Sequence, residues 1–282
     1  MALMGDWYTE EWQGQGAAIS LKIAQRLYVE QSAFQLVEVF ETETFGRLLT
    51  LDGLVMVTDR DNFFYHEMLS HPALFTHPAP REVLIIGGGD CGTLREVLKH
   101  DEVKRVVQME LDEAVTRVAA QFFPLLCESN GDPRAELRFG DGLRYVTEAP
   151  GDSFDVILVD GTDPIGQAAG LFSPEFYRDC RRLLRPGGIL AGQTESPLLH
   201  SDLIVAVHGA LKTAGFTDTA TVQFPQCTYP SGWWTATLAS RDGVLRTPRP
   251  LPTHLPTRYY NTAIHQGALA LPEFLKQRLA RQ

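Results

Sequence analysis

Residues 83–100 read Val-Leu-Ile-Ile-Gly-Gly-Gly-Asp-Cys-Gly-Thr-Leu-Arg-Glu-Val-Leu-Lys-His, and this stretch decides the fold. Residues 83–86 are an unbroken apolar run, which is typical of a strand buried on both faces of a parallel sheet. From Thr93 onward the apolar side chains are spaced as on one face of a helix. The chain is therefore predicted to turn sharply from strand to helix over residues 87–92. The glycines there let the backbone approach a ligand closely.

The same turn contains Gly-x-Gly-x-x-Gly. Glu110 follows roughly 20 residues later, which is the spacing that a dinucleotide-binding fold uses. A nicotinamide-dependent oxidoreductase is therefore one hypothesis. Asp90 inside the turn argues against it, because a carboxylate there would repel a pyrophosphate. The same carboxylate would attract the cationic tail of a different ligand. The structural alternative is that Asp90 only caps the helix.

Composition limits the classes of protein to consider. The chain has 282 residues, of which 44% are hydrophobic and 21% charged, as in ordinary globular proteins. Its net charge of −10 argues against nucleic acid as a partner and is compatible with a cationic substrate, although solubility explains the charge equally well. No apolar run is long enough for a membrane span and no leader is evident, so we expect a cytoplasmic protein without a membrane partner. The four cysteines are dispersed, which indicates neither a zinc site nor a disulfide framework.

The order of expected elements predicts two domains. Residues 1–62 contain short β-rich runs and an Asp-Gly hairpin signal, which predict a small N-terminal antiparallel β domain. Residues 63–282 alternate strands and helices, which predicts a Rossmann-like, doubly wound α/β sheet that binds ligands at the carboxyl ends of its strands. The β-runs at residues 219–224 and 233–239 have no helix between them, and this ending resembles the AdoMet-methyltransferase fold.

Within the second domain we predict strands at residues 83–86, 103–110, 135–139, 154–160 and 189–193. We predict helices at residues 63–70, 112–123, 201–213 and 272–279, another that starts at Ser173 and closes at residues 185–188, and a loop at residues 163–172.

Acidic residues recur where four successive predicted strands end, namely Asp90, Glu110, Asp141 and Asp160 with Asp163. Since parallel strands end at one edge of a sheet, we expect these side chains to line one crevice. Glu110 can accept both hydroxyls of a ribose. Asp141 can accept a hydrogen bond from an adenine amino group, with Gly142 leaving room for the base, and Asp90 can pair with a cation. The alternative is that each acid is a turn or capping residue.

Residues 87–96, Gly-Gly-Gly-Asp-Cys-Gly-Thr-Leu-Arg-Glu, resemble the glycine-rich signature of the polyamine aminopropyltransferases, and the resemblance covers nearly the whole chain. It implies transfer of an aminopropyl group from decarboxylated AdoMet to putrescine, giving spermidine and methylthioadenosine. Decarboxylated AdoMet is then a co-substrate, and no cofactor or metal is implied. The resemblance also implies a homodimer or homotetramer. Cys91 is a departure, because the family usually has a glycine there.

The resemblance assigns roles to particular side chains. Those implied to bind decarboxylated AdoMet are Gln35, Asp90, Glu110, Asp141 and Gly142. Asp160 is implied to accept the proton of the attacking amine, and Tyr65 and Tyr229 to orient its nitrogen. The other implied substrate contacts are His66, Asp90, Asp163 and, through water, Glu195. Without the resemblance, an exposed strand position for Gln35 and core packing for the two tyrosines would be the better interpretations.

The implied chemistry explains why acids are useful. An alkylammonium has a pKa near that of lysine, about 10.4, and has no lone pair while it is protonated. Carboxylates attract such a cation and receive its proton. Two departures from the family bear on which amine is accepted. The family tends to have Pro and Glu at the positions of Gln167 and Ala169, and it often has Gln at the position of Trp233. Cadaverine or spermidine therefore stays open as the acceptor, and a methyltransferase or a non-catalytic adenosyl-binding module is a third class.

Overall fold

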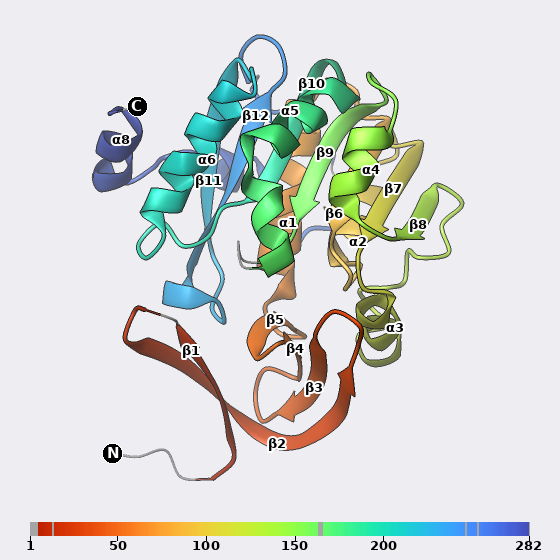
Figure 1. Cartoon of the computed structure of the whole chain (residues 1–282), viewed down its shortest axis with the longest axis vertical. Coiled ribbons are helices and arrows are strands. Elements are labelled where there is room, and N and C mark those ends of the chain that lie inside the picture. Colours follow the sequence, from red (N-terminus) through yellow and green to blue (C-terminus); the bar gives the residue numbers. More distant parts are fainter. Residues whose placement is uncertain (1–4, 13, 163–165, 246, 253, 282) are drawn as a thin grey trace.

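The computed structural model describes residues 5–12, 14–162, 166–245, 247–252 and 254–281, which form two sheets and the helices around them (Figure 1). The first sheet is antiparallel and has the strand order β1-β2-β3-β4-β5. Its strands are β1 (Trp7–Trp12), β2 (Ala17–Gln31), β3 (Leu36–Thr42), β4 (Arg47–Leu51) and β5 (Leu54–Thr58). This sheet confirms the antiparallel N-terminal part predicted from the sequence, whereas the domain boundary after residue 62 stays a prediction.

The second sheet has the strand order β11-β12-β10-β9-β6-β7-β8. Its strands are β6 (Glu82–Gly87), β7 (Arg105–Glu110), β8 (Ala135–Phe139), β9 (Phe154–Asp160), β10 (Leu184–Gln193), β11 (Asp218–Pro225) and β12 (Trp233–Ser240). Neighbouring strands from β10 to β8 are parallel, while β12 and β11 are antiparallel to their neighbours. This order confirms the predicted methyltransferase-like sheet. The chain leaves β6 toward β7 on one side and returns to β9 on the other, so a crevice opens at their carboxyl ends.

Helices cover both faces of this sheet (Figure 1). The α-helices are α1 (Asn62–Thr76), α2 (Gly92–Leu98), α3 (Glu113–Phe122), α4 (Gly142–Glu148), α5 (Pro174–Leu183), α6 (Ser201–Thr213), α7 (Thr262–Ala268) and α8 (Glu273–Leu279). Two short 3-10 helices are η1 (Gly166–Phe172) and η2 (Pro230–Gly232). In the described ranges, none of these helices combines the length and the apolar character that a bilayer crossing requires.

The strand β6 shows why both faces are covered. Its side chains alternate, so that Val83 and Ile85 share a core with α1 and α2. Leu84 and Ile86 point the other way, into a core with α4, α5 and α6. All four side chains are buried, as the unbroken apolar run predicts.

Helix α3 joins the two sheets. Its side chains Val115 and Val118 pack against Val37 of β3 and Leu49 of β4, in a core that belongs to the small sheet. Since α3 follows directly after β7, this packing holds the small sheet beside the carboxyl ends of the large one.

Several predicted bounds differ from the structure. Helix α1 continues through Pro72 to Thr76, beyond the predicted end at residue 70, although a proline inside a helix costs about 3 kcal/mol. Its residues from Tyr65 to Thr76 are all buried, and this tertiary packing outweighs the local preference. Strand β10 begins at Leu184 rather than residue 189, and its register with β9 shifts before Ile189. The helix α4 was not predicted, and η1 occupies part of the expected loop.

Candidate active site

The glycine turn and the end of β9 fit against each other. In the parallel pair of β6 and β9, Gly87 is the partner of Asp160. Gly87 and Gly88 have φ angles of 83° and 69°, a region that favours glycine. A Cβ on Gly87 would lie 2.2 Å from the carbonyl oxygen of Asp160, and one on Gly88 would lie 2.8 Å from its Oδ2. The missing side chains therefore let Asp160 pack directly on the turn.

Cys91, the departure from the family signature, fits the turn. It has a φ angle of 67°, which costs a residue with a Cβ about 1–2 kcal/mol. Its buried thiol donates a hydrogen bond to the Gly89 carbonyl at 3.7 Å and also interacts with the thiol of Cys127. The interaction with Cys127 and burial together raise the pKa of the Cys91 thiol.

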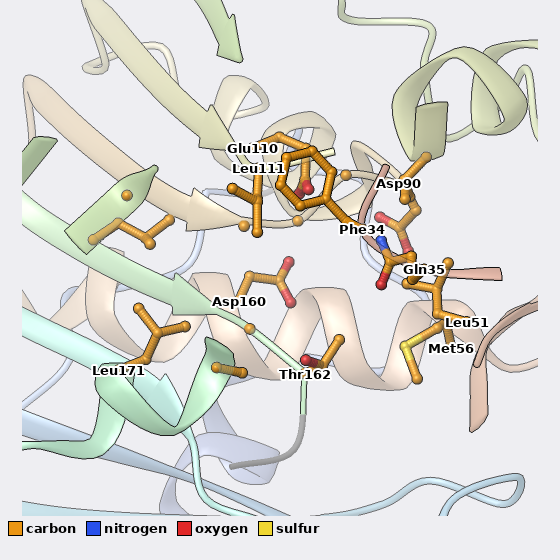
Figure 2. Close-up of a pocket in the computed structure, with 18 of the residues that line it drawn as sticks. Phe34, Gln35, Leu51, Met56, Asp90, Glu110, Leu111, Asp160, Thr162 and Leu171 are labelled. Atoms are coloured by element: carbon orange, nitrogen blue, oxygen red, sulfur yellow. The ribbon is translucent and has the colours of Figure 1, made fainter. Parts of the chain in front are cut away.

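A cavity of about 690 Å³ lies where the turn, the strand ends and the small sheet meet (Figure 2). Its volume is within the range of about 300–1,000 Å³ that small-molecule sites have. The residues predicted for the site that line it are Gln35, Tyr65, Asp90, Glu110, Asp141, Gly142, Asp160 and Tyr229. In Figure 2, Asp160 lies between Leu171 on one side and Asp90 with Gln35 on the other.

Asp160 is held by a hydrogen bond to each carboxylate oxygen. The hydroxyl of Tyr65 donates to Oδ1 at 2.7 Å, and the hydroxyl of Thr93 donates to Oδ2 at 2.6 Å. Burial and the nearby Asp90 carboxylate raise the pKa of Asp160. Burial also raises the pKa of Tyr65 well above its ordinary value, so this phenol stays protonated and can donate. The Asp160 carboxylate is therefore fixed in the cavity wall, and it binds a proton more tightly than an ordinary aspartate does.

Asp90 is engaged with the turn and with α1. Its Oδ1 accepts the Gly92 backbone N–H at 2.8 Å, and its Oδ2 lies 3.1 Å from Nε2 of His66. Burial by itself would raise the pKa of Asp90, but the His66 ring outweighs burial and holds that pKa below its ordinary value. Burial would likewise lower the pKa of His66, and the Asp90 carboxylate raises it instead. His66 thus lies behind Asp90 rather than in the cavity wall.

Glu110 and Gln35 lie at the side of the cavity next to α3. Glu110 Oε1 accepts the Asp112 backbone N–H at 2.8 Å, and burial raises the pKa of Glu110 to about 7. The Gln35 amide donates to Asp112 Oδ2 at 3.0 Å, and Ser32 donates to the same oxygen at 2.6 Å. Asp112 therefore orients Gln35, a role that the sequence analysis missed because this residue was treated only as the start of a helix.

Asp141 begins the unpredicted helix α4. Its Oδ1 accepts the backbone N–H of Leu143 at 2.8 Å, so the carboxylate caps that helix while it lines the cavity. A Cβ on Gly142 would lie 2.7 Å from Cγ2 of Ile86. The glycine therefore lets the start of α4 lie against β6.

A second cavity, of about 40 Å³, adjoins the first at Tyr65 and Tyr229, and Glu10 and Trp234 line its other side. Glu10 is buried and its Oε2 accepts the Val55 backbone N–H at 2.6 Å. Burial, with a contribution from Glu195, raises the pKa of Glu10. Sequence analysis missed Glu10. The signal available was an acid on the same face of β1 as the aromatic residues two positions before and after it.

The three other predicted residues are Glu195, Tyr229 and Asp163. Glu195 has a φ angle of 65°, and its carboxylate lies 3.1 Å from the His200 ring. It is not among the described residues that line either cavity, although it influences Glu10 from nearby. The Tyr229 hydroxyl donates to the Met56 carbonyl, and Asp163 lies outside the described residues. Across the ranges that the structure describes, no three His, Cys, Asp or Glu side chains form a group that could hold a metal ion.

The seven-stranded sheet and the cavity at its carboxyl edge define a methyltransferase-like α/β protein with an acidic small-molecule site. Two family models match the chain, "Spermine/spermidine synthase domain" over residues 62–247 and "Spermidine synthase tetramerisation domain" over residues 6–59. The polyamine aminopropyltransferase of Nitrosococcus oceani is 56% identical over 96% of both chains, and that of Methylococcus capsulatus is 55% identical over 95% of both.

Solved structures agree with these relatives. A spermidine synthase in complex with the transition-state analogue AdoDATO superimposes with a TM-score of 0.93 and 36% identity over 98% of this chain and 95% of that one. The spermidine synthase of Thermotoga maritima gives a TM-score of 0.92 and 36% identity over 100% and 97%. The chain belongs to the polyamine aminopropyltransferase family, which confirms the resemblance in its glycine-rich signature. The nicotinamide oxidoreductase hypothesis is set aside.

Proposed function

We propose that this enzyme transfers the aminopropyl group of decarboxylated AdoMet to putrescine, and that it releases spermidine and methylthioadenosine. The observation that carries the proposal is the Asp160 carboxylate, which is fixed through both oxygens in the wall of a cavity that Asp90 and Glu110 also line. Two cationic substrates need such a site, because neighbouring carboxylates offset the repulsion between them.

The co-substrate would lie along the edge formed by β6, β7 and α4. Glu110 would accept the ribose hydroxyls, with Gln35 beside it on the small sheet. Asp141 would accept the adenine amino group through Oδ2, since its Oδ1 is used to cap α4. The propylammonium tail would pair with Asp90, and this carboxylate is ionised because His66 lowers its pKa.

The chemical step needs a neutral amine. We propose that the ammonium of putrescine gives a proton to Asp160 while Tyr65 keeps the carboxylate in place. The freed lone pair attacks the methylene next to the sulfonium, so a carbon–nitrogen bond forms and the carbon–sulfur bond breaks. The sulfur leaves as a neutral thioether and requires no acid. The raised pKa of Asp160 narrows the gap to an amine pKa of about 10.4.

The small second cavity supports a short diamine as the acceptor. Glu10 provides a buried carboxylate on the far side of Tyr65 and Tyr229, where the second ammonium of putrescine would bind. Trp234 lines the same cavity of about 40 Å³, which leaves little room for the extra aminopropyl group of spermidine. We also propose a homodimer or homotetramer, with support from the match of residues 6–59 to a tetramerisation domain. The cytoplasmic location stays a prediction.

The test is incubation of the purified protein with decarboxylated AdoMet and putrescine, cadaverine or spermidine, followed by mass spectrometry. We expect methylthioadenosine and putrescine heavier by one C3H7N unit, with less product from the other amines. No transfer to any amine would refute the function, and a preference for cadaverine or spermidine would refute the choice of putrescine. Asp160→Asn should lower turnover about 10²- to 10⁴-fold. Asp101→Asn, which removes an exposed carboxylate, is the control for charge.

A further inference from the structure

The Asp160 carboxylate has a second hydrogen-bond donor in addition to the tyrosine. Thr93, in the first turn of α2, is fully buried, and its hydroxyl donates to Asp160 Oδ2 at 2.6 Å. The Tyr65 hydroxyl occupies Oδ1 on the other side. Two donors from two helices therefore fix the plane of one carboxylate.

The Thr93 hydroxyl donates to Asp160 and not to the backbone. A threonine inside a helix commonly donates to the carbonyl four residues earlier. Here that carbonyl belongs to Gly89, which lies before α2 begins, and the Thr93 hydroxyl donates to Asp160 instead. Gly88 leaves the space that Oδ2 of Asp160 occupies, since a Cβ there would lie only 2.8 Å from this oxygen.

The environment of Asp160 otherwise favours its protonated form. In the described part of the chain, the titratable groups around it are Tyr65 and His66 of α1, Asp90 of the turn and Glu110 of β7. Burial and Asp90 raise the pKa of Asp160, whereas His66 and the hydrogen bonds from Thr93 and Tyr65 lower it. A base has to be ionised before it can accept a proton, so these donors oppose the loss of the active form.

We propose that Thr93 is a positioning residue for the transfer reaction, whose hydroxyl orients the Asp160 carboxylate and keeps it ionised in the empty site. This inference rests on the proposed function, because it assigns Thr93 a role through the base of that reaction. It predicts that the donor matters more than the shape of the side chain.

Thr93→Val keeps the shape and removes the donor. Loss of the hydrogen bond disfavours the carboxylate, so the pKa of Asp160 should rise. The acid limb of the pH profile of kcat/KM should then move upward by about one pH unit, which is about tenfold less activity on the acid side. Much of the activity should return at alkaline pH. Thr93→Ser keeps a hydroxyl and should restore the wild-type limb.

Thr116→Val is the matched control, because it removes a buried hydroxyl of α3 that donates to the Gly89 carbonyl of the same turn and not to Asp160. Its acid limb should stay in place. The second measurement is the titration of the Asp160 carboxyl carbon by NMR in ¹³C-aspartate-labelled protein without substrates, with Asp160→Asn used to assign the signal. The signal should titrate at higher pH in Thr93→Val than in the wild type.

Suppose that the wild type transfers the aminopropyl group, and that Thr93→Val shifts neither the pH profile of kcat/KM nor the NMR titration of Asp160. This outcome would overturn the inference and leave the proposed function intact. If the wild type transferred no aminopropyl group, the proposed function would fail, and an unshifted NMR titration would still refute the role of Thr93. Should Thr93→Val not fold, Thr93→Ala lacks the same donor and provides the same two comparisons. A shift of equal size in Thr116→Val would show a general effect of the turn and would also overturn the inference.

Discussion

Replacement of Glu110 by Gln should stabilise the empty protein and impair binding of the nucleoside. Glu110 is 9% exposed, and burial raises its pKa from 4.5 to about 7. At about 1.4 kcal/mol for each pH unit, this shift corresponds to roughly 3 kcal/mol of lost stability once the carboxylate is charged. Glutamine has the same shape without the charge, and its oxygen can still accept the Asp112 backbone N–H.

The sign of the pH dependence follows from proton binding. Because the pKa is higher in the folded state, the folded protein binds the proton more tightly than the unfolded chain does. Stability from this group therefore falls as the pH rises from 4.5 through about 7, and the loss is complete above that value.

The assay is urea-induced unfolding of the wild type and Glu110→Gln at pH 8 and at pH 5. We expect the variant to be more stable by up to about 3 kcal/mol at pH 8, with most of this difference gone at pH 5. Affinity for methylthioadenosine, measured by calorimetry at pH 8, should fall at least about tenfold, because a charged acceptor is lost. A stability difference that is the same at both pH values would refute the assignment of the cost to a buried charge.

Three further substitutions test other contacts. Asp90→Asn should weaken binding of decarboxylated AdoMet about tenfold or more and methylthioadenosine far less, and equal losses in calorimetry would contradict the pairing with the propylammonium. Gly92→Ala would place a Cβ 2.1 Å from the His66 ring, so thermal unfolding should show about 1–3 kcal/mol of destabilisation, and an unchanged melting temperature would contradict this packing. Glu67→Gln should cost roughly 3 kcal/mol in urea unfolding, because the buried carboxylate accepts the backbone N–H groups of residues 258–260 at 2.7–2.9 Å. A cost below about 1 kcal/mol would show that the amide oxygen replaces the carboxylate.

The sequence was most informative where function and topology share one pattern. The apolar run before Gly87 is typical of a buried parallel strand, and parallel strands end at one edge. Acids after successive strands, such as Asp90, Glu110 and Asp160, could therefore be expected in one cavity, and they line it. Local patterns sufficed because each acid lies at the end of its own strand or in the turn that follows it.

Features that depend on distant parts of the chain could not be predicted in this way. Glu10 reaches the site from an antiparallel strand far from the glycine turn in sequence, and only the packing of the two sheets reveals it. Asp112 caps α3 and also holds Gln35, which is 77 positions away. Helix α1 continues through Pro72 because its surroundings are buried, a property that local preference does not contain.

The pairing of Gly87 with Asp160 makes the role that we propose for Asp160 depend on strand alignment. Successive side chains of a strand point to opposite faces, so a displacement of β9 by a single residue would rotate the carboxylate out of the cavity and present Val159 or Gly161 to the turn. A one-residue deletion or insertion in β9 can thus leave a folded sheet and still abolish the reaction. In directed evolution of this enzyme, we therefore expect insertions and deletions to be accepted in the loops and rejected in β9.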